Sequence, residues 1–294
     1  MDLRNQNKTK PFIFKQYISV IRFKHTSIKF LIFDYEKCRL RIIGWGVRGF
    51  AHLGIIKYLE EQNIQPTMIS GTSAGAIVGA LYAVGLDPEA ILHVMKNNSH
   101  FGWNAIAWRD KGIFSMDALR NVLNKYIIID EFSSLKIPLY VTATDFVNNT
   151  AITFSEGPLI DAIVASCSIP FIFKPINKDN YTLIDGGVLN NFPIEPLIGQ
   201  CELIIGSHVN KIDTSILNNE SLKVVDLLDR CFHMAISKEV NEKKLKCHLF
   251  IESPLHPYNM FDLKAADTIF EIGYNTAKSF QNQIEQLILH QTIS

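Results

Sequence analysis

Cysteine is scarce in this sequence and follows no recognisable pattern. The 294-residue chain has five cysteines, and no two of them form a CxxC pair. An odd number of widely spaced cysteines argues against a disulfide framework and against a zinc site, and it favours a reducing compartment. The cysteines are Cys38, Cys167, Cys201, Cys231 and Cys247.

Long hydrophobic runs are also lacking. No uninterrupted apolar stretch approaches the roughly 18 to 20 residues that a membrane-spanning helix requires. The N-terminal stretch has no apolar segment followed by a small-residue cleavage site, as a secretory signal would have. We therefore expect no transmembrane helix and no cleavable signal peptide, and we expect a cytoplasmic protein.

The chain carries no net charge, because 29 Lys and Arg balance 29 Asp and Glu. This balance gives no reason to expect a nucleic-acid partner. Charge is nevertheless uneven, since residues 1–41 hold ten Lys or Arg and only three Asp or Glu. Aromatic residues interleave with these basic residues, as in segments that lie on anionic membranes. We expect residues 1–39 to form a basic, aromatic-rich extension. Residues 11–33 would then either contact a membrane surface or simply pad the fold.

The rest of the chain has the composition of a globular domain, with 47% hydrophobic and 20% charged residues. From residue 39 onward, short apolar strands alternate with glycine turns and helices. Two such units open this region, and further strands are predicted near residues 139–144, 182–184 and 203–207. The alternation predicts an α/β fold: a mainly parallel central sheet with helices on both faces.

Gly71-Thr72-Ser73-Ala74-Gly75 follows the second predicted strand and precedes an apolar helix. The G-x-S-x-G pattern in this strand-turn-helix context is typical of a nucleophile elbow, where a sharp turn exposes a serine. Gly71 and Gly75 would let the backbone turn. The following helix would direct the positive end of its dipole toward a developing oxyanion.

A second glycine-rich turn, Gly44-Trp45-Gly46-Val47-Arg48-Gly49, follows the first predicted strand. Its backbone amides could form an oxyanion hole. The turn also satisfies the bare G-x-G-x-x-G pattern of dinucleotide-binding proteins. That interpretation needs an acidic residue near the end of the next strand, and the chain has the serine turn there instead.

A carboxylate flanked by glycines completes the set. Asp185-Gly186-Gly187 follows the apolar pair Leu183-Ile184. An aspartate at a strand end can take a proton from a serine if the two side chains reach hydrogen-bond distance. The two glycines would allow such a close approach.

Together these three motifs resemble those of the patatin-like phospholipases. The residues GWGVRGFAHLG (44–54) resemble the family's glycine-rich oxyanion block, and DGGVLNNFP (185–193) resembles its catalytic-aspartate block. Supporting stretches, TATD (142–145) and FSEGPLIDAIVASCSIPFIFKP (154–175), also match. The resemblance covers roughly residues 40–280, with the motifs in the family's order. We therefore expect a patatin-like domain over residues 40–285.

The resemblance implies a three-layer α/β/α sandwich of the patatin/lysophospholipase kind and a Ser-Asp catalytic dyad without histidine. Ser73 would be the nucleophile and Asp185 the base. The oxyanion turn would consist of Gly44, Trp45, Gly46, Val47 and Arg48. The implied activity is hydrolysis of fatty acyl esters of phospholipids or other lipids, with no metal and no organic cofactor.

Trp45 departs from the family pattern, in which the middle position of this turn is a glycine. A side chain there can forbid a positive φ and can fill the space of the substrate carbonyl. An alternative function is therefore a catalytically weak, lipid-binding or effector-like protein with the patatin fold.

Two rival chemistries are less well supported by the sequence. A Ser-His-Asp hydrolase would need a histidine after the acid in chain order, and none of the four available has a distinctive motif around it. These are His208, His233, His248 and His256. A thiol nucleophile at Cys167 would lie outside the nucleophile motif, so we expect a packed thiol there.

Overall fold

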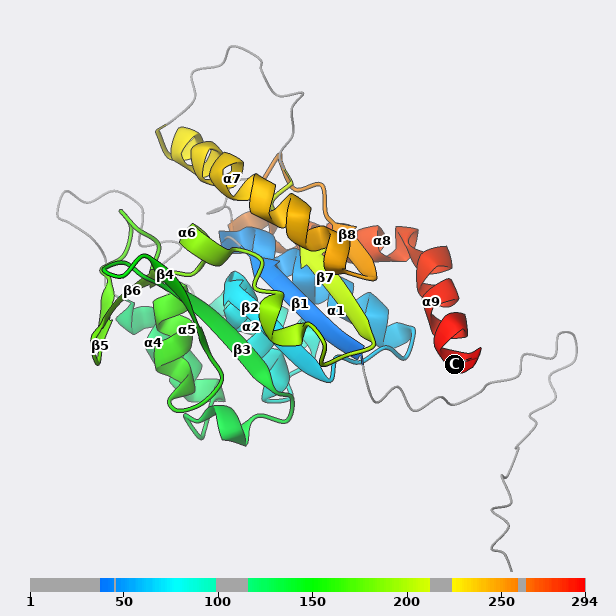
Figure 1. Cartoon of the computed structure of the whole chain (residues 1–294), viewed down its shortest axis with the longest axis horizontal. Coiled ribbons are helices and arrows are strands. Elements are labelled where there is room, and N and C mark those ends of the chain that lie inside the picture. Colours follow the sequence, from blue (N-terminus) through cyan, green and yellow to red (C-terminus); the bar gives the residue numbers. More distant parts are fainter. Residues whose placement is uncertain (1–37, 45, 99–115, 212–223, 259–262, 294) are drawn as a thin grey trace, which may run out of the picture. The chain divides into compact units, whose positions relative to one another are not determined.

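The protein is described here by a computed structural model that covers residues 38–44, 46–98, 116–211, 224–258 and 263–293. Within these ranges eight strands form one sheet (Figure 1). The strands are β1 (Cys38–Gly44), β2 (Met68–Ser73), β3 (Leu139–Asp145), β4 (Thr150–Phe154), β5 (Ile176–Lys178), β6 (Tyr181–Asp185), β7 (Leu203–His208) and β8 (Leu249–Glu252).

Helices connect and cover these strands. The α-helices are α1 (Phe50–Glu61), α2 (Ala74–Ala83), α3 (Pro88–Asn97), α4 (Asp117–Tyr126), α5 (Leu159–Ser166), α6 (Gly187–Asn190), α7 (Val224–Lys243), α8 (Ala266–Ser279) and α9 (Gln281–Ile293). Short 3₁₀ segments precede or follow several of them, including η1 (Gly46–Gly49), which leads directly into α1.

The centre of the sheet is parallel. Strands β3, β2, β1, β7 and β8 lie side by side in that order, and each pairs with its neighbour in the parallel direction. Strands β4, β5 and β6 pair antiparallel at the β3 end. The mainly parallel sheet expected from the sequence is confirmed, with an antiparallel margin that the sequence did not indicate.

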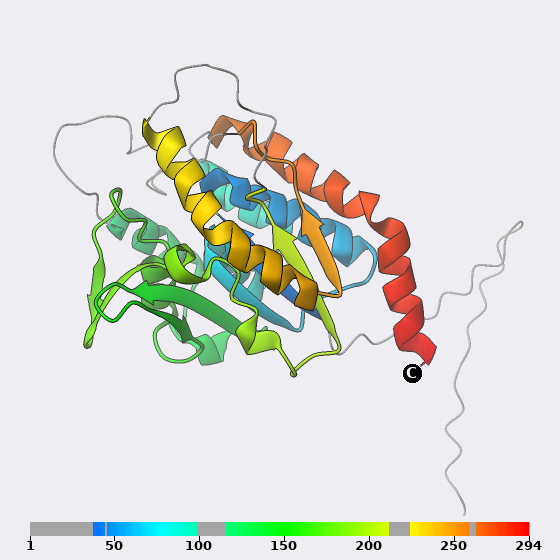
Figure 2. The same ribbon diagram turned by 45° about the horizontal axis from the view of Figure 1, so that its top comes forward.

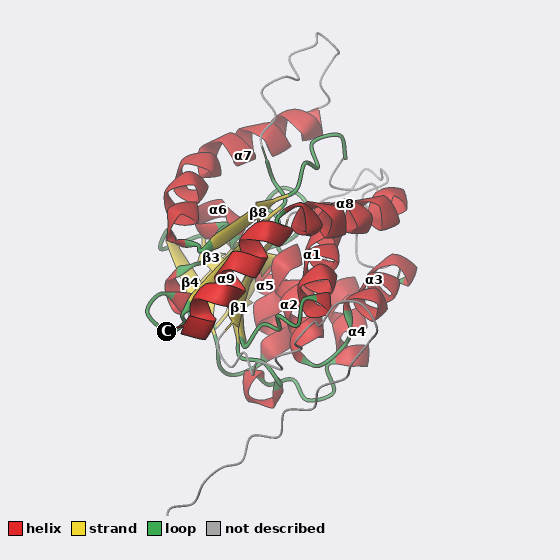
Figure 3. Ribbon diagram, turned by 90° about the vertical axis from the view of Figure 1, so that its right-hand side faces the viewer, coloured by secondary structure: helices red, strands yellow, loops and turns green. Residues whose placement is uncertain are grey.

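Helices lie on both sides of this sheet, as a three-layer architecture requires. Seen from the side, α6 and α7 lie on one face, whereas α1, α2 and α8 lie on the other (Figure 3). A view tilted by 45° shows α7 running across the parallel strands (Figure 2). The predicted α/β/α fold is confirmed.

The two faces of the sheet differ in their packing. The main hydrophobic cluster includes side chains of α1, α2, α3, α5 and α8 and of the sheet. Two smaller clusters are separate from it: Phe192 packs with Val240 of α7, and Met68, Ile194, Leu197 and Ile204 form the other. Helix α7 therefore contributes Val240 to a small core of its own, apart from the main one.

Local sequence signals explain where α2 ends and where α3 begins. Gly85 has φ +108° and follows α2, in a conformation that side-chain-bearing residues rarely adopt. Asp87 then caps α3, since its carboxylate accepts a hydrogen bond from the Ala90 amide at 2.7 Å.

Among the helices of the described ranges, none is long and apolar enough to cross a membrane.

The predicted N-terminal extension lies almost entirely outside the described residues. The membrane contact expected for residues 11–33 therefore stays a prediction, as does the boundary between the extension and the domain. The described part of the sheet begins with Cys38, the first residue of β1.

Candidate active site

Ser73 lies at a strained turn between strand and helix. It is the last residue of β2, and α2 begins at Ala74. Its backbone has φ 54° and ψ −125°, an unusual conformation for a residue other than glycine. Such strain is typically found at functional sites. The nucleophile elbow predicted from the G-x-S-x-G pattern has the expected backbone form.

Gly71 allows the chain to fold back so tightly. A Cβ atom on Gly71 would lie 2.7 Å from the carbonyl carbon and oxygen of Gly75. Strand and helix backbones therefore approach each other too closely for any side chain at this position. The contact therefore explains the glycine at position 71.

A serine from another helix holds this turn in place. The Ser73 amide donates a hydrogen bond to Oγ of Ser166 at 2.9 Å, and the Ser166 hydroxyl donates to the Thr142 carbonyl at 2.6 Å. Ser166 is fully buried at the end of α5. The bond occupies the amide of Ser73, so that amide is not available to bind an oxyanion.

The topology of the sheet brings Asp185 to Ser73. Strand β4 occupies one edge of β3 along Val141–Asp145, so β2 and β6 must share the other edge. There β2 pairs as far as Thr142, and β6 runs in the opposite direction and ends with Asp185 beside Ala143. The carboxyl ends of β2 and β6 therefore meet next to β3.

Gly186 makes this meeting sterically possible. A Cβ atom on Gly186 would lie 2.1 Å from the Thr142 carbonyl oxygen and 3.0 Å from Cγ2 of Thr72. No side chain fits in that space. The Asp185 amide also donates to the Ser168 carbonyl at 2.9 Å, which fixes the end of β6 against the segment that follows α5.

The Asp185 carboxyl is fully buried and has few partners. Burial raises its pKa to about 7, against opposing hydrogen bonds from the Ser73 hydroxyl and the Gly187 amide. The Gly187 amide donates to Oδ1 at 2.7 Å. Oδ2 makes no hydrogen bond of normal geometry with the described residues. A carboxylate with a pKa near neutrality is well suited to act as a general base.

Cys167 lies in the same place. Its thiol is buried, and its pKa is raised well above the usual value by burial and by the charge of Asp185, although a hydrogen bond with Ser73 opposes this. The thiol is therefore neutral, and a nucleophilic thiolate is disfavoured. The expected packed thiol is found, and it packs against the serine and the aspartate.

The predicted oxyanion turn is partly described. Gly44 ends β1 directly beside Ser73 in the parallel register, and Gly46 begins η1. Val47 is buried, and Arg48 donates from Nε to the Tyr258 carbonyl at 3.0 Å. The first amides of a helical segment have no intrahelical acceptor, so this turn offers donors next to Ser73. Trp45 lies outside the described residues.

Histidines do not take part in the hydrogen bonds of this site, as far as the described residues show. His52 contacts Oγ of Ser207 at 2.6 Å, and His208 contacts Oε1 of Glu252 at 2.8 Å. His248 accepts from the Ile204 amide. The hydrogen bonds of Ser73 and Asp185 involve no imidazole in the described part of the chain.

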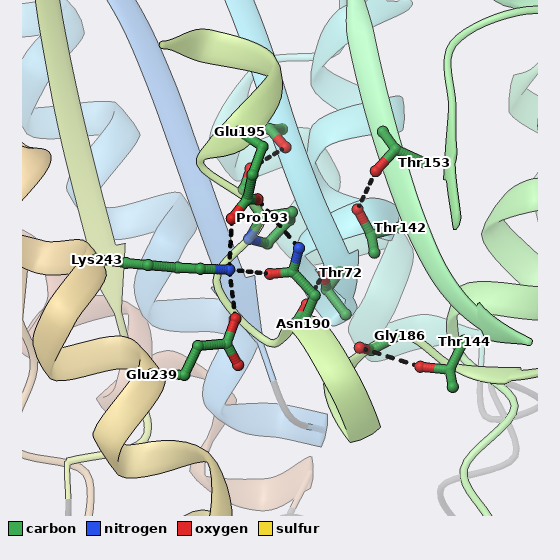
Figure 4. A network of polar contacts seen from close by, with 11 residues as sticks. Thr72, Thr142, Thr144, Thr153, Gly186, Asn190, Pro193, Glu195, Glu239 and Lys243 are labelled. Carbon is green, nitrogen blue, oxygen red and sulfur yellow. Dashed lines mark hydrogen bonds and ion pairs between the residues drawn. The ribbon is translucent and has the colours of Figure 1, made fainter. Parts of the chain in front are cut away.

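The loop after Asp185 is anchored on both sides (Figure 4). Thr72 of β2 donates to the Asn190 carbonyl at 3.2 Å. From α7, Lys243 donates to Oδ1 of Asn190 at 2.8 Å and pairs with Glu195 at 2.7 Å, and it also pairs with Glu239. The segment that carries the aspartate is thus fixed to the sheet and to α7.

The structure brings together the predicted Ser73, Asp185, Gly71, Gly75 and Gly186. Gly187 also contributes, through its amide bond to Asp185. Sequence reasoning assigned no role to Ser166, although it belongs to a stretch that resembles the family. Within the described residues, no group of three or more His, Cys, Asp or Glu side chains is arranged to hold a metal ion.

Comparison with known proteins identifies the family of this chain. Residues 44–198, more than half of the chain, match the family model described as "Patatin-like phospholipase". An uncharacterised NTE family protein of Mycobacterium tuberculosis is 32% identical over 177 residues, which are 56% of this chain and 47% of that protein. Lysophospholipase NTE1 of Kluyveromyces lactis is 24% identical over 273 residues, 83% of this chain and 19% of that protein.

The fold has a solved counterpart as well. The crystal structure of VipD from Legionella pneumophila superposes with a TM-score of 0.50 at 15% identity, covering 84% of this chain and 67% of VipD. At such low identity the likeness concerns the fold alone. The chain spans about half the length of the mycobacterial relative and less of the yeast one. On the match over residues 44–198, the chain belongs to the patatin-like phospholipase family.

Proposed function

We propose that this chain is a lipid acyl hydrolase that cleaves fatty acyl esters with Ser73 as nucleophile and Asp185 as base. The observation that carries the proposal is that the ends of β2 and β6 meet at β3, which brings Ser73, on a strained elbow, to the buried Asp185 carboxylate, whose pKa is raised to about 7. Membership in a family of phospholipases and similarity to a lysophospholipase support lysophospholipids and phospholipids as the substrate class.

In the first step the Ser73 oxygen attacks the ester carbonyl carbon, and Asp185 takes the hydroxyl proton. The oxyanion that forms would be stabilised by amides of the turn of Gly44, Trp45, Gly46, Val47 and Arg48, with support from the N-terminus of α2. Collapse of the tetrahedral intermediate expels the alcohol, which receives the proton from Asp185. The acyl group remains on Ser73.

In the second step water attacks the acyl-enzyme, and Asp185 again accepts a proton. The fatty acid leaves, and the proton returns to the Ser73 oxygen. An aspartate with a pKa of about 7 can perform both transfers, because its ionised and protonated forms are both populated at neutral pH. Neither step uses a metal ion or an organic cofactor.

The test is turnover of lysophosphatidylcholine, mixed phospholipids and p-nitrophenyl butyrate by the purified chain. We expect Ser73→Ala and Asp185→Asn each to lower kcat/KM by about 10³-fold or more. Turnover by the wild-type chain no faster than by these two variants would refute the proposal.

The weaker, lipid-binding alternative depends on Trp45. If the Trp45 side chain obstructs the oxyanion turn, Trp45→Gly will raise the esterase rate about tenfold or more, since one oxyanion donor contributes about 10²- to 10³-fold. A rate that stays the same or falls would instead favour a site that accommodates the tryptophan, and it would contradict the weak, lipid-binding alternative.

A further inference from the structure

Near Asp185, a second buried polar side chain makes no hydrogen bond within the part of the chain that the structure describes. Asn191 follows α6 in the aspartate block and is completely buried, yet neither Nδ2 nor Oδ1 of its carboxamide makes a hydrogen bond with the described residues. A buried amide without partners is destabilising by about 1 to 3 kcal/mol per unmade bond. Such groups are rare in native proteins and call for an explanation.

Gly187 shows where this carboxamide lies. A Cβ atom on Gly187 would be 2.9 Å from Oδ1 of Asn191, 3.0 Å from Oδ1 of Asp185 and 3.4 Å from Cζ of Phe232. Oδ1 of Asn191 and Oδ1 of Asp185 therefore lie on the same side of Gly187, and Cζ of Phe232, in α7, lies near the same point. Oδ2 of Asp185 likewise makes no hydrogen bond with any described residue.

The preceding residue, the half-buried Asn190 at the end of α6, differs from Asn191 in its hydrogen bonds. Asn190 has the same side chain, and its carboxamide is fully engaged: Nδ2 donates to Glu195 at 3.1 Å and Oδ1 accepts from Lys243 at 2.8 Å (Figure 4). One asparagine of the pair thus anchors the loop to α7. The other lies next to the proposed base with its polar atoms unused.

We propose that Asn191 is a catalytic residue that binds the water molecule which hydrolyses the acyl-enzyme. This inference rests on the proposed function, since it assigns a role in the second step of that reaction. The Asn191 carboxamide oxygen accepts one hydrogen of the water, and Oδ2 of Asp185 accepts the other. With both hydrogens held, a lone pair of the water oxygen points at the acyl carbon.

The water oxygen forms a bond to the acyl carbon of the Ser73 ester, and its proton passes to Asp185. The tetrahedral intermediate then breaks its bond to the Ser73 oxygen, which takes the proton back from Asp185. Free fatty acid leaves, and Asn191 keeps its own protons throughout.

Pre-steady-state kinetics with p-nitrophenyl butyrate separate this role from acylation. Release of p-nitrophenolate in the first turnover reports attack by Ser73, and the steady-state rate reports attack by water once deacylation is the slower step. For Asn191→Ala we expect a first-turnover rate within about threefold of wild type and a deacylation rate about 10- to 100-fold lower. Added hydroxylamine, which attacks the acyl-enzyme without the bound water, should restore most of the turnover.

Two further variants serve as controls. Asn191→Leu keeps the size and removes both polar atoms, so its Tm should equal or exceed that of wild type while deacylation stays slow. Asn190→Ala removes a bonded carboxamide from the same loop, and its ratio of acylation to deacylation should match wild type.

Equal losses in the first turnover and in the steady state for both Asn191 variants would overturn the role of Asn191 in deacylation. So would deacylation at the wild-type rate in Asn191→Leu. A wild-type chain that forms no acyl-enzyme at all would instead refute the proposed function and, with it, this inference.

Discussion

Ser73 and Asp185 meet at one point, but they are held there in opposite ways. The backbone of Ser73 is strained, with φ 54°, and its amide is bonded to Ser166. The backbone of Asp185 is an ordinary strand end, whereas its carboxyl is fully buried, with Oδ2 unpaired within the described residues. One half of the site carries conformational strain and the other carries a desolvated charge.

This difference shows how the fold stabilises an arrangement that is locally unfavourable. Strain of about 1 to 3 kcal/mol persists only where surrounding contacts over-determine the conformation, as Ser166 and the Gly71 contact do for Ser73. The desolvated carboxylate persists because β6 is fixed by its pairing with β3 and by the anchored loop that follows it. Each half should therefore respond to a different kind of perturbation.

The largest expected effect comes from moving Asp185 away from Ser73. In Gly186→Ala the new methyl group would overlap the Thr142 carbonyl of β3 and crowd the Thr72 side chain of β2, so the end of β6 must move away from both strands. We expect kcat/KM to fall about 10³-fold and the free energy of unfolding to fall by about 2 to 4 kcal/mol. Esterase assays and urea unfolding measure both. Activity within tenfold of wild type would show that the close approach is not needed.

Loss of the bond that holds the elbow should have a smaller effect. Ser166→Ala leaves the buried Ser73 amide without its acceptor, so we expect kcat to fall about 10- to 100-fold with little change in KM. Ser168→Ala is the matched control, because that hydroxyl donates to the Val164 carbonyl at 2.8 Å, one turn earlier in the same segment, and not to the elbow. A similar loss of kcat in both variants would mean that Ser166 acts through general stability alone.

The raised pKa of Asp185 should make the activity depend on pH. Only the ionised carboxylate can take the Ser73 proton, so kcat/KM should rise about tenfold per pH unit below the pKa of about 7 and level off above it. A profile of initial rates from pH 5 to 9 measures this. A plateau that extends down to pH 5 would contradict a buried Asp185 base.

The smallest effect concerns stability and has an unusual sign. Because the pKa of Asp185 is raised from 3.8 to about 7 on folding, the native state holds this proton more tightly, and stability falls as pH rises through that range. Asp185→Asn should therefore raise Tm by about 2 to 6 °C at pH 8 and by less at pH 5, although it abolishes activity. Thermal unfolding at both pH values tests this.

Asp145 provides a control of opposite sign for that experiment. Burial raises the pKa of Asp145, but hydrogen bonds from Asn148 and from the Val147 amide lower it overall. Asp145→Asn should therefore lower Tm at pH 8. An equal shift in both variants would show that the carboxylate environments are not the cause.

Much of the turn that carries Ser73 could be predicted from the sequence, because the residues that determine it are close together in the chain. Ser73 lies between an apolar strand and an apolar helix, and the flanking glycines imply a sharp turn. Gly85 and Asp87 likewise mark the end of α2 and the start of α3 by local preference alone. These signals depend on residues a few positions apart.

The rest depends on contacts between distant segments, which no local pattern contains. Ser166 is 93 residues from the amide that it holds, and the raised pKa of Asp185 depends on what buries it. Strands β5 and β8 have three and four residues, too few for alternation to be recognised. Asn191 lay within a recognised motif, but its lack of partners became evident only in the structure.

Covalent labelling tests the central claim most directly. The chain would be treated with a fluorophosphonate, digested, and the labelled peptide identified by mass spectrometry, with labelling rates measured from pH 5 to 9. We predict a single adduct on Ser73 and a rate that rises through about pH 7 in wild type. Asp185→Asn should label far more slowly at every pH. An adduct on another residue, or equal labelling of both proteins, would contradict the Ser73–Asp185 dyad.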